Sequence, residues 1–240
     1  SGVMLTSEAQ AAHTFDNKVY FTGNSKPMTQ SYTCGSGATL LVLGIVTMGT
    51  TARSGGAPTY NGATMTQVDQ TRSSGSEVNV EMWYLLNPST GSSYTISVPN
   101  NAYDLLHVIA SSYKAQTGYQ SALDTSSGDQ NTGSANPYVC VTTNADGDVI
   151  VDILGDGQNN IPTGHGPEGS EVLYSQYDDT YGFSANAQYR IQSAAGQTCP
   201  SWTVATNDWA MIVGAFKEVS LPTLEQEGFR RFAAQRGNWA

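Results

Sequence analysis

The sequence predicts an all-β fold, an antiparallel two-sheet β-sandwich of jelly-roll-like type with extended N- and C-terminal arms. Two observations predict it. Apolar segments of strand length recur along the chain, separated by clusters of Gly, Pro, Asn and Ser. Within several of these segments apolar side chains alternate with hydroxyls, which is the pattern of a strand with one dry face and one wet face.

Residues 82–99 show both features most clearly. Two β-prone apolar runs flank the turn-forming sequence NPSTGSS, in which Pro88 fixes φ and Gly91 permits a positive φ. The chain is therefore expected to reverse here. In residues 94–98, YTISV, apolar and hydroxyl side chains alternate strictly. This stretch predicts a strand, a turn and a second strand.

The other predicted strands form two groups along the chain. The first group is 38–48, 58–70, 78–87, 93–98 and 104–114, and the second is 137–143, 148–154, 170–176, 187–193, 201–206 and 209–219. Segments 38–48 and 209–219 are the least interrupted by polar residues, so we expect central strands that are buried on both faces. Within 58–70, Asn61-Gly62 favours a tight hairpin turn.

Two polar segments, 123–137 and 155–170, have no apolar periodicity and are predicted to be long surface loops. No internal repeat of fixed period is visible. We expect three parts: an extended N-terminal arm over 1–30 with room for one strand, a sandwich over 31–220, and a C-terminal arm or short helix over 221–240. Helical spacing of apolar residues in the last part is interrupted by Gly228.

The composition favours a protein that works outside the cytoplasm. Only 12% of the 240 residues are charged, and the chain contains 13 Tyr. A neutral, hydroxyl-rich surface suits a virion or extracellular location. The net charge of −10 argues against nucleic-acid partners and against binding to anionic membranes. No apolar run is long enough for membrane insertion, since 38–48 is far too short.

Three segments together carry a family resemblance: PTYNGATMTQV, EMWYLLNPSTGSSYTISV and WAMIVGAFKEV. Over about residues 36–220, the chain resembles a jelly-roll-like β-sandwich domain of tailed-phage structural proteins, such as decoration and fibre proteins, and of bacterial surface proteins. The resemblance implies a structural, decorating or adhesive role and supplies no catalytic residues. A fold with so many roles does not by itself determine function.

The residues do not predict an enzyme. A nucleophilic mechanism needs a positioned base, but the chain has no GxSxG motif, His107 lies within an apolar strand, and His165 lies between two glycines. The third histidine is His13. A glycosidase needs two converging carboxylates. The acidic candidates are Asp152, Asp156, Glu168, Glu171, Asp178 and Asp179, and nothing in the sequence brings two of them together.

Calcium is the cofactor question that the sequence raises. Residues 144–148, NADGD, place oxygen-bearing side chains at alternate positions, including Asp146 and Asp148. The glycine and glutamate positions of an EF-hand loop do not match, and a hairpin turn joining 137–143 to 148–154 explains the same residues. We therefore predict no cofactor and no metal. Calcium binding at Asp146 and Asp148 stays open.

The cysteines leave several states open. Cys34, Cys140 and Cys199 allow three alternative disulfides, each with one free thiol, or three buried thiols. Their spacing matches no zinc motif.

The C-terminal segment is the strongest candidate for a subunit interface. It carries basic and aromatic side chains on an otherwise acidic chain, a combination suited to docking on a neighbouring copy. The candidate interface residues are Phe229, Arg230, Arg231, Phe232, Arg236 and Trp239. The alternative is a frayed terminus or one that folds back. The sequence thus predicts a non-enzymatic structural subunit that forms homo-oligomers or a larger viral or extracellular assembly.

A second hypothesis is a carbohydrate-binding or adhesion module. Five aromatic residues crowd into 174–189, and Tyr177 and Tyr181 could form a glycan platform if they are exposed. The alternative is that these tyrosines cap the sandwich core.

Overall fold

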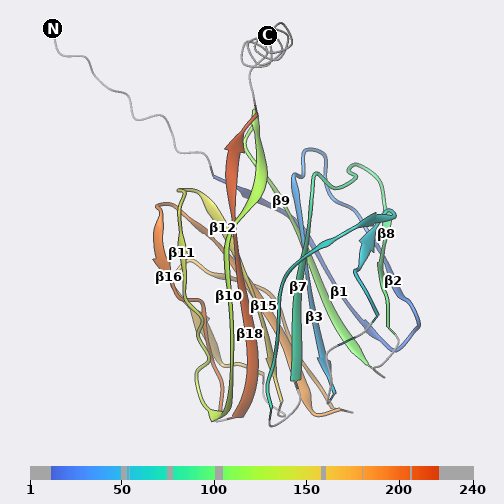
Figure 1. The fold of residues 1–240 in the computed structure, drawn as a ribbon, viewed down its shortest axis with the longest axis vertical. Helices are drawn as coiled ribbons and strands as arrows, with labels where there is room; N and C mark the ends of the chain where they lie inside the picture. Colours follow the sequence, from blue (N-terminus) through green and yellow to red (C-terminus); the bar gives the residue numbers. More distant parts are fainter. Residues whose placement is uncertain are drawn as a thin grey trace, which may run out of the picture.

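The computed structural model describes residues 12–49, 53, 55–74, 78–100, 105–157, 161–179, 181–205 and 207–221. In these residues every regular element is a β-strand, so the predicted all-β sandwich is confirmed (Figure 1). Of the two predicted arms, residues 1–11 and 222–240 lie outside the described residues.

Two large antiparallel sheets, one from each half of the chain, pack face to face. The first has the order β1 (Thr14–Gly23), β9 (Leu106–Lys114), β3 (Leu40–Met48), β7 (Val78–Leu86), β6 (Thr66–Arg72). The second has the order β10 (Tyr119–Ser134), β18 (Asn207–Ser220), β12 (Asp148–Asp156), β15 (Phe183–Gln192), β14 (Glu171–Asp178). The predicted central strands 38–48 and 209–219 correspond to β3 and β18, neither of which is an edge strand.

Smaller sheets cover the outer face of each large sheet. On the first, β2 (Met28–Tyr32), β8 (Tyr94–Val98), β4 (Thr59–Tyr60) and β5 (Ala63–Thr64) pair in that order. On the second, β11 (Val141–Thr143) pairs with β16 (Gly196–Thr198), and β13 (Gly164–Gly166) pairs with β17 (Ser201–Thr203). The sandwich therefore has four layers, two more than the sequence predicts.

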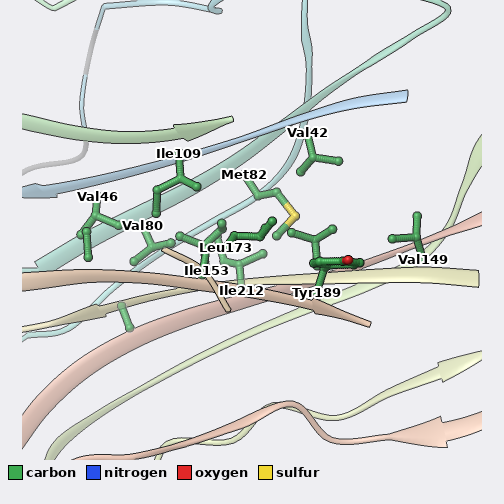
Figure 2. Close-up of a cluster of buried hydrophobic side chains, with 14 of the residues drawn as sticks. Val42, Val46, Val80, Met82, Ile109, Val149, Ile153, Leu173, Tyr189 and Ile212 are labelled. Carbon is green, nitrogen blue, oxygen red and sulfur yellow. The ribbon is translucent and has the colours of Figure 1, made fainter. Parts of the chain in front are cut away.

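Strand alternation explains how one strand serves two layers. In β3, Leu40 and Val42 face the second large sheet, whereas Leu41 and Leu43 face the small sheet. The inner core lies between the large sheets, where Val42, Val46, Val80, Met82 and Ile109 of the first half meet Val149, Ile153, Leu173, Tyr189 and Ile212 of the second (Figure 2). Burial on both faces is why these strands read as nearly continuous apolar runs.

The two halves of the chain share one topology. In chain order and in sheet position, β1, β3, β6, β7 and β9 correspond to β10, β12, β14, β15 and β18. Both halves have a bulge in the first strand, between Phe15 and Asn17 or between Leu123 and Thr125. Both halves also have a second bulge, in β6 of the first half and in β14 of the second. The chain therefore contains an internal structural repeat, although no repeat is visible in its sequence.

The equivalence extends to side chains at the first bulge. The bulged residue is Asp16 in the first half and Asp124 in the second. Asp16 Oδ1 lies 3.0 Å from Lys114 Nζ, and Asp124 Oδ1 lies 3.0 Å from Lys217 Nζ. Each aspartate also accepts a backbone N–H from the loop before the next large-sheet strand, from Gly35 at 2.7 Å and from Asn144 at 2.6 Å. Few other side chains match, so the repeat is invisible to a search for sequence period.

The hairpin and turn predictions hold locally. Asn61 and Gly62 both have positive φ and join β4 to β5, and Gly91 has a φ of 80°. Ile96 and Val98 of β8 are buried, as the alternation predicts.

Several loop and arm predictions are wrong. Segment 123–137 is mostly strand, because the long β18 pairs with β10 along its backbone whatever side chains β10 carries. The prediction for segment 155–170 is wrong only in part: the segment contains the end of β12 and the three-residue β13, and its other described residues are outside strands. Residues 14–30 form β1 and part of β2, and β1 pairs with β9, so they belong to the sandwich and not to an arm. The strands β11 and β12 do not form a hairpin, since they pair in different sheets.

Candidate functional site

The described chain ends meet at one end of the sandwich. Thr14, the first residue of β1, pairs with Lys114, and Tyr119 pairs with Ser220, the last residue of β18. A turn at Thr117-Gly118 joins Lys114 to Tyr119, so these four residues lie at the same end (Figure 1). We call this surface the terminal end.

Exposed apolar side chains gather at the terminal end. Phe15 and Tyr119 are each 36% exposed, and Leu221 is 47% exposed. The predicted interface residues Phe229, Arg230, Arg231, Phe232, Arg236 and Trp239 lie outside the described residues. Their segment follows Leu221 in the sequence.

The structure places Tyr177 near the end of β14 and Tyr181 in the connection from β14 to β15. Tyr177 is a half-buried residue of β14, and Tyr181 is 42% exposed in the turn. The Tyr181 backbone N–H donates to Asp178 Oδ1 at 3.0 Å. The two tyrosines are thus near in sequence and accessible to different degrees.

A cavity of about 500 Å³ lies on the outer side of β10 and β18. It is lined by Ser127, Gly128, Asp129, Asn131, Ser134, Ala135, Asn136, Tyr138, Val139, Cys140 and Trp209. Trp209 is buried and donates its Nε1–H to Ser134 Oγ at 2.9 Å, whereas Tyr138 is 62% exposed. We call this space the Tyr138 cavity. The sequence does not indicate this cavity, because most of its lining residues belong to the polar segment 123–137, whose composition is that of a surface loop.

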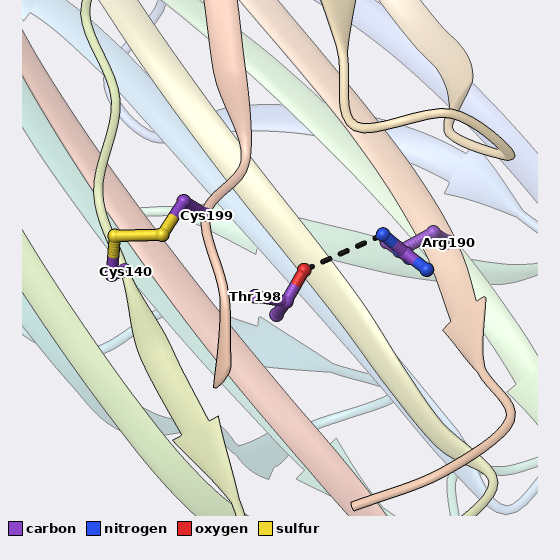
Figure 3. The surroundings of a disulfide bond; sticks show 4 residues. All are labelled: Cys140, Arg190, Thr198 and Cys199. Atoms are coloured by element: carbon purple, nitrogen blue, oxygen red, sulfur yellow. Dashed lines mark hydrogen bonds between the residues drawn. A yellow bond between two sulfur atoms is a disulfide. The ribbon is translucent and has the colours of Figure 1, made fainter. Parts of the chain in front are cut away.

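The segment that carries Tyr138 is fixed on both sides. Val139 N–H donates to Pro200 O at 3.1 Å, and Trp202 N–H donates to Pro137 O at 3.0 Å. Cys140 and Cys199 form a disulfide, which settles the pairing left open by the sequence (Figure 3). Cys34 is a free, buried thiol.

Beside the disulfide, Arg190 of β15 donates to Thr198 Oγ1 at 3.4 Å (Figure 3). This contact ties β16 to the large sheet. The disulfide and these hydrogen bonds thus connect the segment that carries Tyr138, and the neighbouring β16, to the rest of the body.

Asp148, the first residue of β12, lies near Asp124 of β10. Asp148 is fully buried, and its pKa is raised to about 7, chiefly by burial and next by the negative charge of Asp124. For Asp124, burial alone would raise the pKa, but the Asn144 N–H and the Lys217 ammonium outweigh it and lower the pKa. The two shifts favour a proton on Asp148 and a negative charge on Asp124.

The calcium candidates take separate roles. Asp146 accepts the backbone N–H of Ala195, while Asp148 is buried at the start of β12. Among the described residues no group of three or more His, Cys, Asp or Glu could hold a metal ion.

The histidines lie apart from the Tyr138 cavity. His107 is buried in β9. Its Nδ1 forms a hydrogen bond of 2.6 Å with the Tyr20 hydroxyl, and its Nε2 lies 3.5 Å from Asp178 Oδ2. His13 is buried, and burial lowers its pKa to about 4, against the opposing effect of the Gly147 carbonyl. His165 lies in β13, so it is part of a paired strand and not of a flexible segment.

The candidate carboxylates are also dispersed. Asp152 accepts the Trp202 indole N–H at 2.7 Å, and Glu171 accepts the Tyr189 hydroxyl at 2.8 Å. Asp178 faces His107. These three carboxylates thus have different partners in different places.

Comparison of the chain with known protein families, with characterised proteins and with solved structures gives no match. In the part of the chain that the structure describes, no helix is long and apolar enough to cross a membrane. The geometry of the molecule itself is therefore the basis for a functional proposal.

Proposed function

We propose that this chain is a non-enzymatic structural subunit of a virion or another extracellular assembly, and that copies associate through the terminal end and the chain segments attached to it. The observation that carries the proposal is the exposure of Phe15, Tyr119 and Leu221 at the end where both described chain ends leave the body. Exposed aromatic and aliphatic side chains beside a basic, aromatic segment are the usual anchors of an interface.

The body has the properties that such a subunit needs. Three apolar cores hold four layers together, so the loops and ends are presented from a stiff frame. The Cys140–Cys199 disulfide and the hydroxyl-rich composition with few charged residues support an oxidising location outside the cytosol. The jelly-roll-like resemblance to phage structural and bacterial surface proteins agrees with the same role.

The test is the native mass of the full chain by light scattering over a range of concentrations. We expect defined oligomers or larger particles. Removing 222–240, or introducing Tyr119→Ser with Leu221→Ser, should lower the mass. Tyr138→Ser is the matched control, because Tyr138 is an exposed tyrosine away from the terminal end. A strict monomer at high concentration, or variants with the same mass as the full chain, would overturn the proposal.

A further inference from the structure

The internal repeat allows the Tyr138 cavity of the second half to be compared with the equivalent position in the first half. Asp129 lies five residues beyond the bulged Asp124 in β10, and Phe21 lies five residues beyond the bulged Asp16 in β1. Phe21 and Asp129 are therefore equivalent positions. Phe21 is 7% exposed and belongs to the apolar core beneath the small sheet.

The neighbouring positions of the two strands are equivalent in the same way. Ser127 and Asn131 in β10 correspond to Val19 and Gly23 in β1. In the first half, Met28 fills the space over this region, with Sδ 3.4 Å from a Cβ built on Gly23. In the second half polar side chains replace the apolar ones, and the space is an open cavity of about 500 Å³.

We propose that the Tyr138 cavity is a binding site for a neutral saccharide. Its volume lies within the range of about 300–1,000 Å³ that is usual for small-molecule sites. Its wall carries the amides of Asn131 and Asn136 and the carboxylate of Asp129. These groups can accept and donate several hydrogen bonds at once, which matches a ligand with many hydroxyls.

Tyr138 supplies the second element of saccharide recognition. Its exposed side chain offers a broad apolar face with a polar tip, on which the C–H face of a sugar ring can stack. The disulfide and the backbone bonds to Pro200 and from Trp202 hold its segment in place, so little ordering is required when a ligand binds.

The charge of the site favours a neutral ligand. Asp129 is the only acidic side chain among the residues that line the cavity, and no Lys or Arg lines it. An anionic ligand such as a sialylated or sulfated glycan would meet a carboxylate without a compensating cation. This site is distinct from Tyr177 and Tyr181, the glycan candidates predicted from the sequence.

The experiment is an array of immobilised oligosaccharides, with neutral glucans, mannans and galactans beside sialylated and sulfated glycans. We expect the full chain to bind at least one neutral glycan. Calorimetry with the best-bound neutral oligosaccharide should show at least a tenfold loss of affinity for Tyr138→Ala. Asp129→Phe, which restores the apolar residue of the first half, should abolish binding.

Tyr181→Ala is the matched control and should bind as the unchanged chain does. Thermal unfolding of every variant identifies any that fails to fold, and Tyr138→Ala keeps the test valid if Asp129→Phe is one of them, because Tyr138 is exposed. The proposal is overturned if the chain binds none of the neutral glycans on the array, if it binds acidic glycans alone, or if Tyr138→Ala binds as tightly as the unchanged chain. A Tyr119→Ser, Leu221→Ser variant should still bind, which separates this proposal from that of self-association.

Discussion

Gly44 of β3 lies directly against Ile153 of β12, at the centre of the contact between the two large sheets: a Cβ built on Gly44 would be 2.4 Å from Ile153 Cδ1. The two residues are equivalent in the internal repeat. Gly44 lies four residues beyond the β3 residue that pairs with Tyr113 of β9, and Ile153 lies four residues beyond the β12 residue that pairs with Phe216 of β18. The exchange recurs with the roles reversed at Gly155, whose Cβ would be 2.9 Å from Val46 Cγ1. A glycine in one half thus accommodates the aliphatic side chain of its counterpart in the other.

Gly44→Ala is expected to destabilise the fold by about 1–3 kcal/mol, because the added methyl group overpacks the inner core. Ile153→Val removes the nearest methyl group and should cost about 0.5–1.5 kcal/mol on its own. The double variant should lose less than the sum of the two, which urea unfolding can measure. Strict additivity would mean that the two residues do not share this space.

Asp16→Ala should cost about 1–3 kcal/mol of unfolding free energy, because it leaves the Gly35 N–H and the Ser112 hydroxyl without their acceptor. Lys114→Met should cost less than about 1 kcal/mol, since that side chain is 36% exposed and its ion pair is screened by solvent. The two unfolding curves in urea distinguish hydrogen bonding from charge pairing. An equal loss for both variants would contradict this order.

The sequence allows the strands of the inner core to be predicted, because β3 and β18 are buried on both faces and carry continuous apolar runs. It does not predict β10, whose strand conformation comes from backbone pairing with β18 and not from its own side chains. The four layers and the repeat are also missed. They depend on which strand pairs with which, and the equivalent strands of the two halves share few residues beyond the Asp–Lys pairs.

The same limit applies to the candidate sites. The tyrosines Tyr177 and Tyr181 could be noted from local crowding alone. The Tyr138 cavity could not, because it needs β10, the disulfide segment and Trp209, which are brought together only by the fold. The disulfide is similar, since its two cysteines are 59 residues apart and meet through the contact between neighbouring strands.

Asp148→Asn should stabilise the fold above neutral pH by up to about 4 kcal/mol and should have little effect near pH 4. The pKa of Asp148 is raised from 3.8 to about 7 on folding, so its contribution is fully present below pH 3.8 and is lost as the pH rises toward 7. His13 acts oppositely. Its pKa falls from 6.5 to about 4, so its contribution is present above pH 6.5 and is lost as the pH falls toward 4.

Urea unfolding of both proteins between pH 4 and pH 8 measures this dependence. The difference between the two curves isolates Asp148, because His13 is common to both. A constant difference across the pH range would show that Asp148 does not change its ionisation in this window.

Replacing both Cys140 and Cys199 with Ser should lower the unfolding free energy by about 2–5 kcal/mol, because the disulfide closes a long loop in the unfolded chain. Affinity for the neutral oligosaccharide should also fall, since the segment that carries Tyr138 loses a fixed anchor.

Cys34 provides an internal reference for the unfolding measurement. It is buried, and burial raises its pKa to about 11, so a thiol reagent should label it only after unfolding. The extent of Cys34 labelling at increasing urea concentrations therefore reports global unfolding, in the unchanged protein and in the variant alike. If the variant is destabilised but binds the saccharide as tightly as before, the disulfide stabilises the fold without positioning Tyr138.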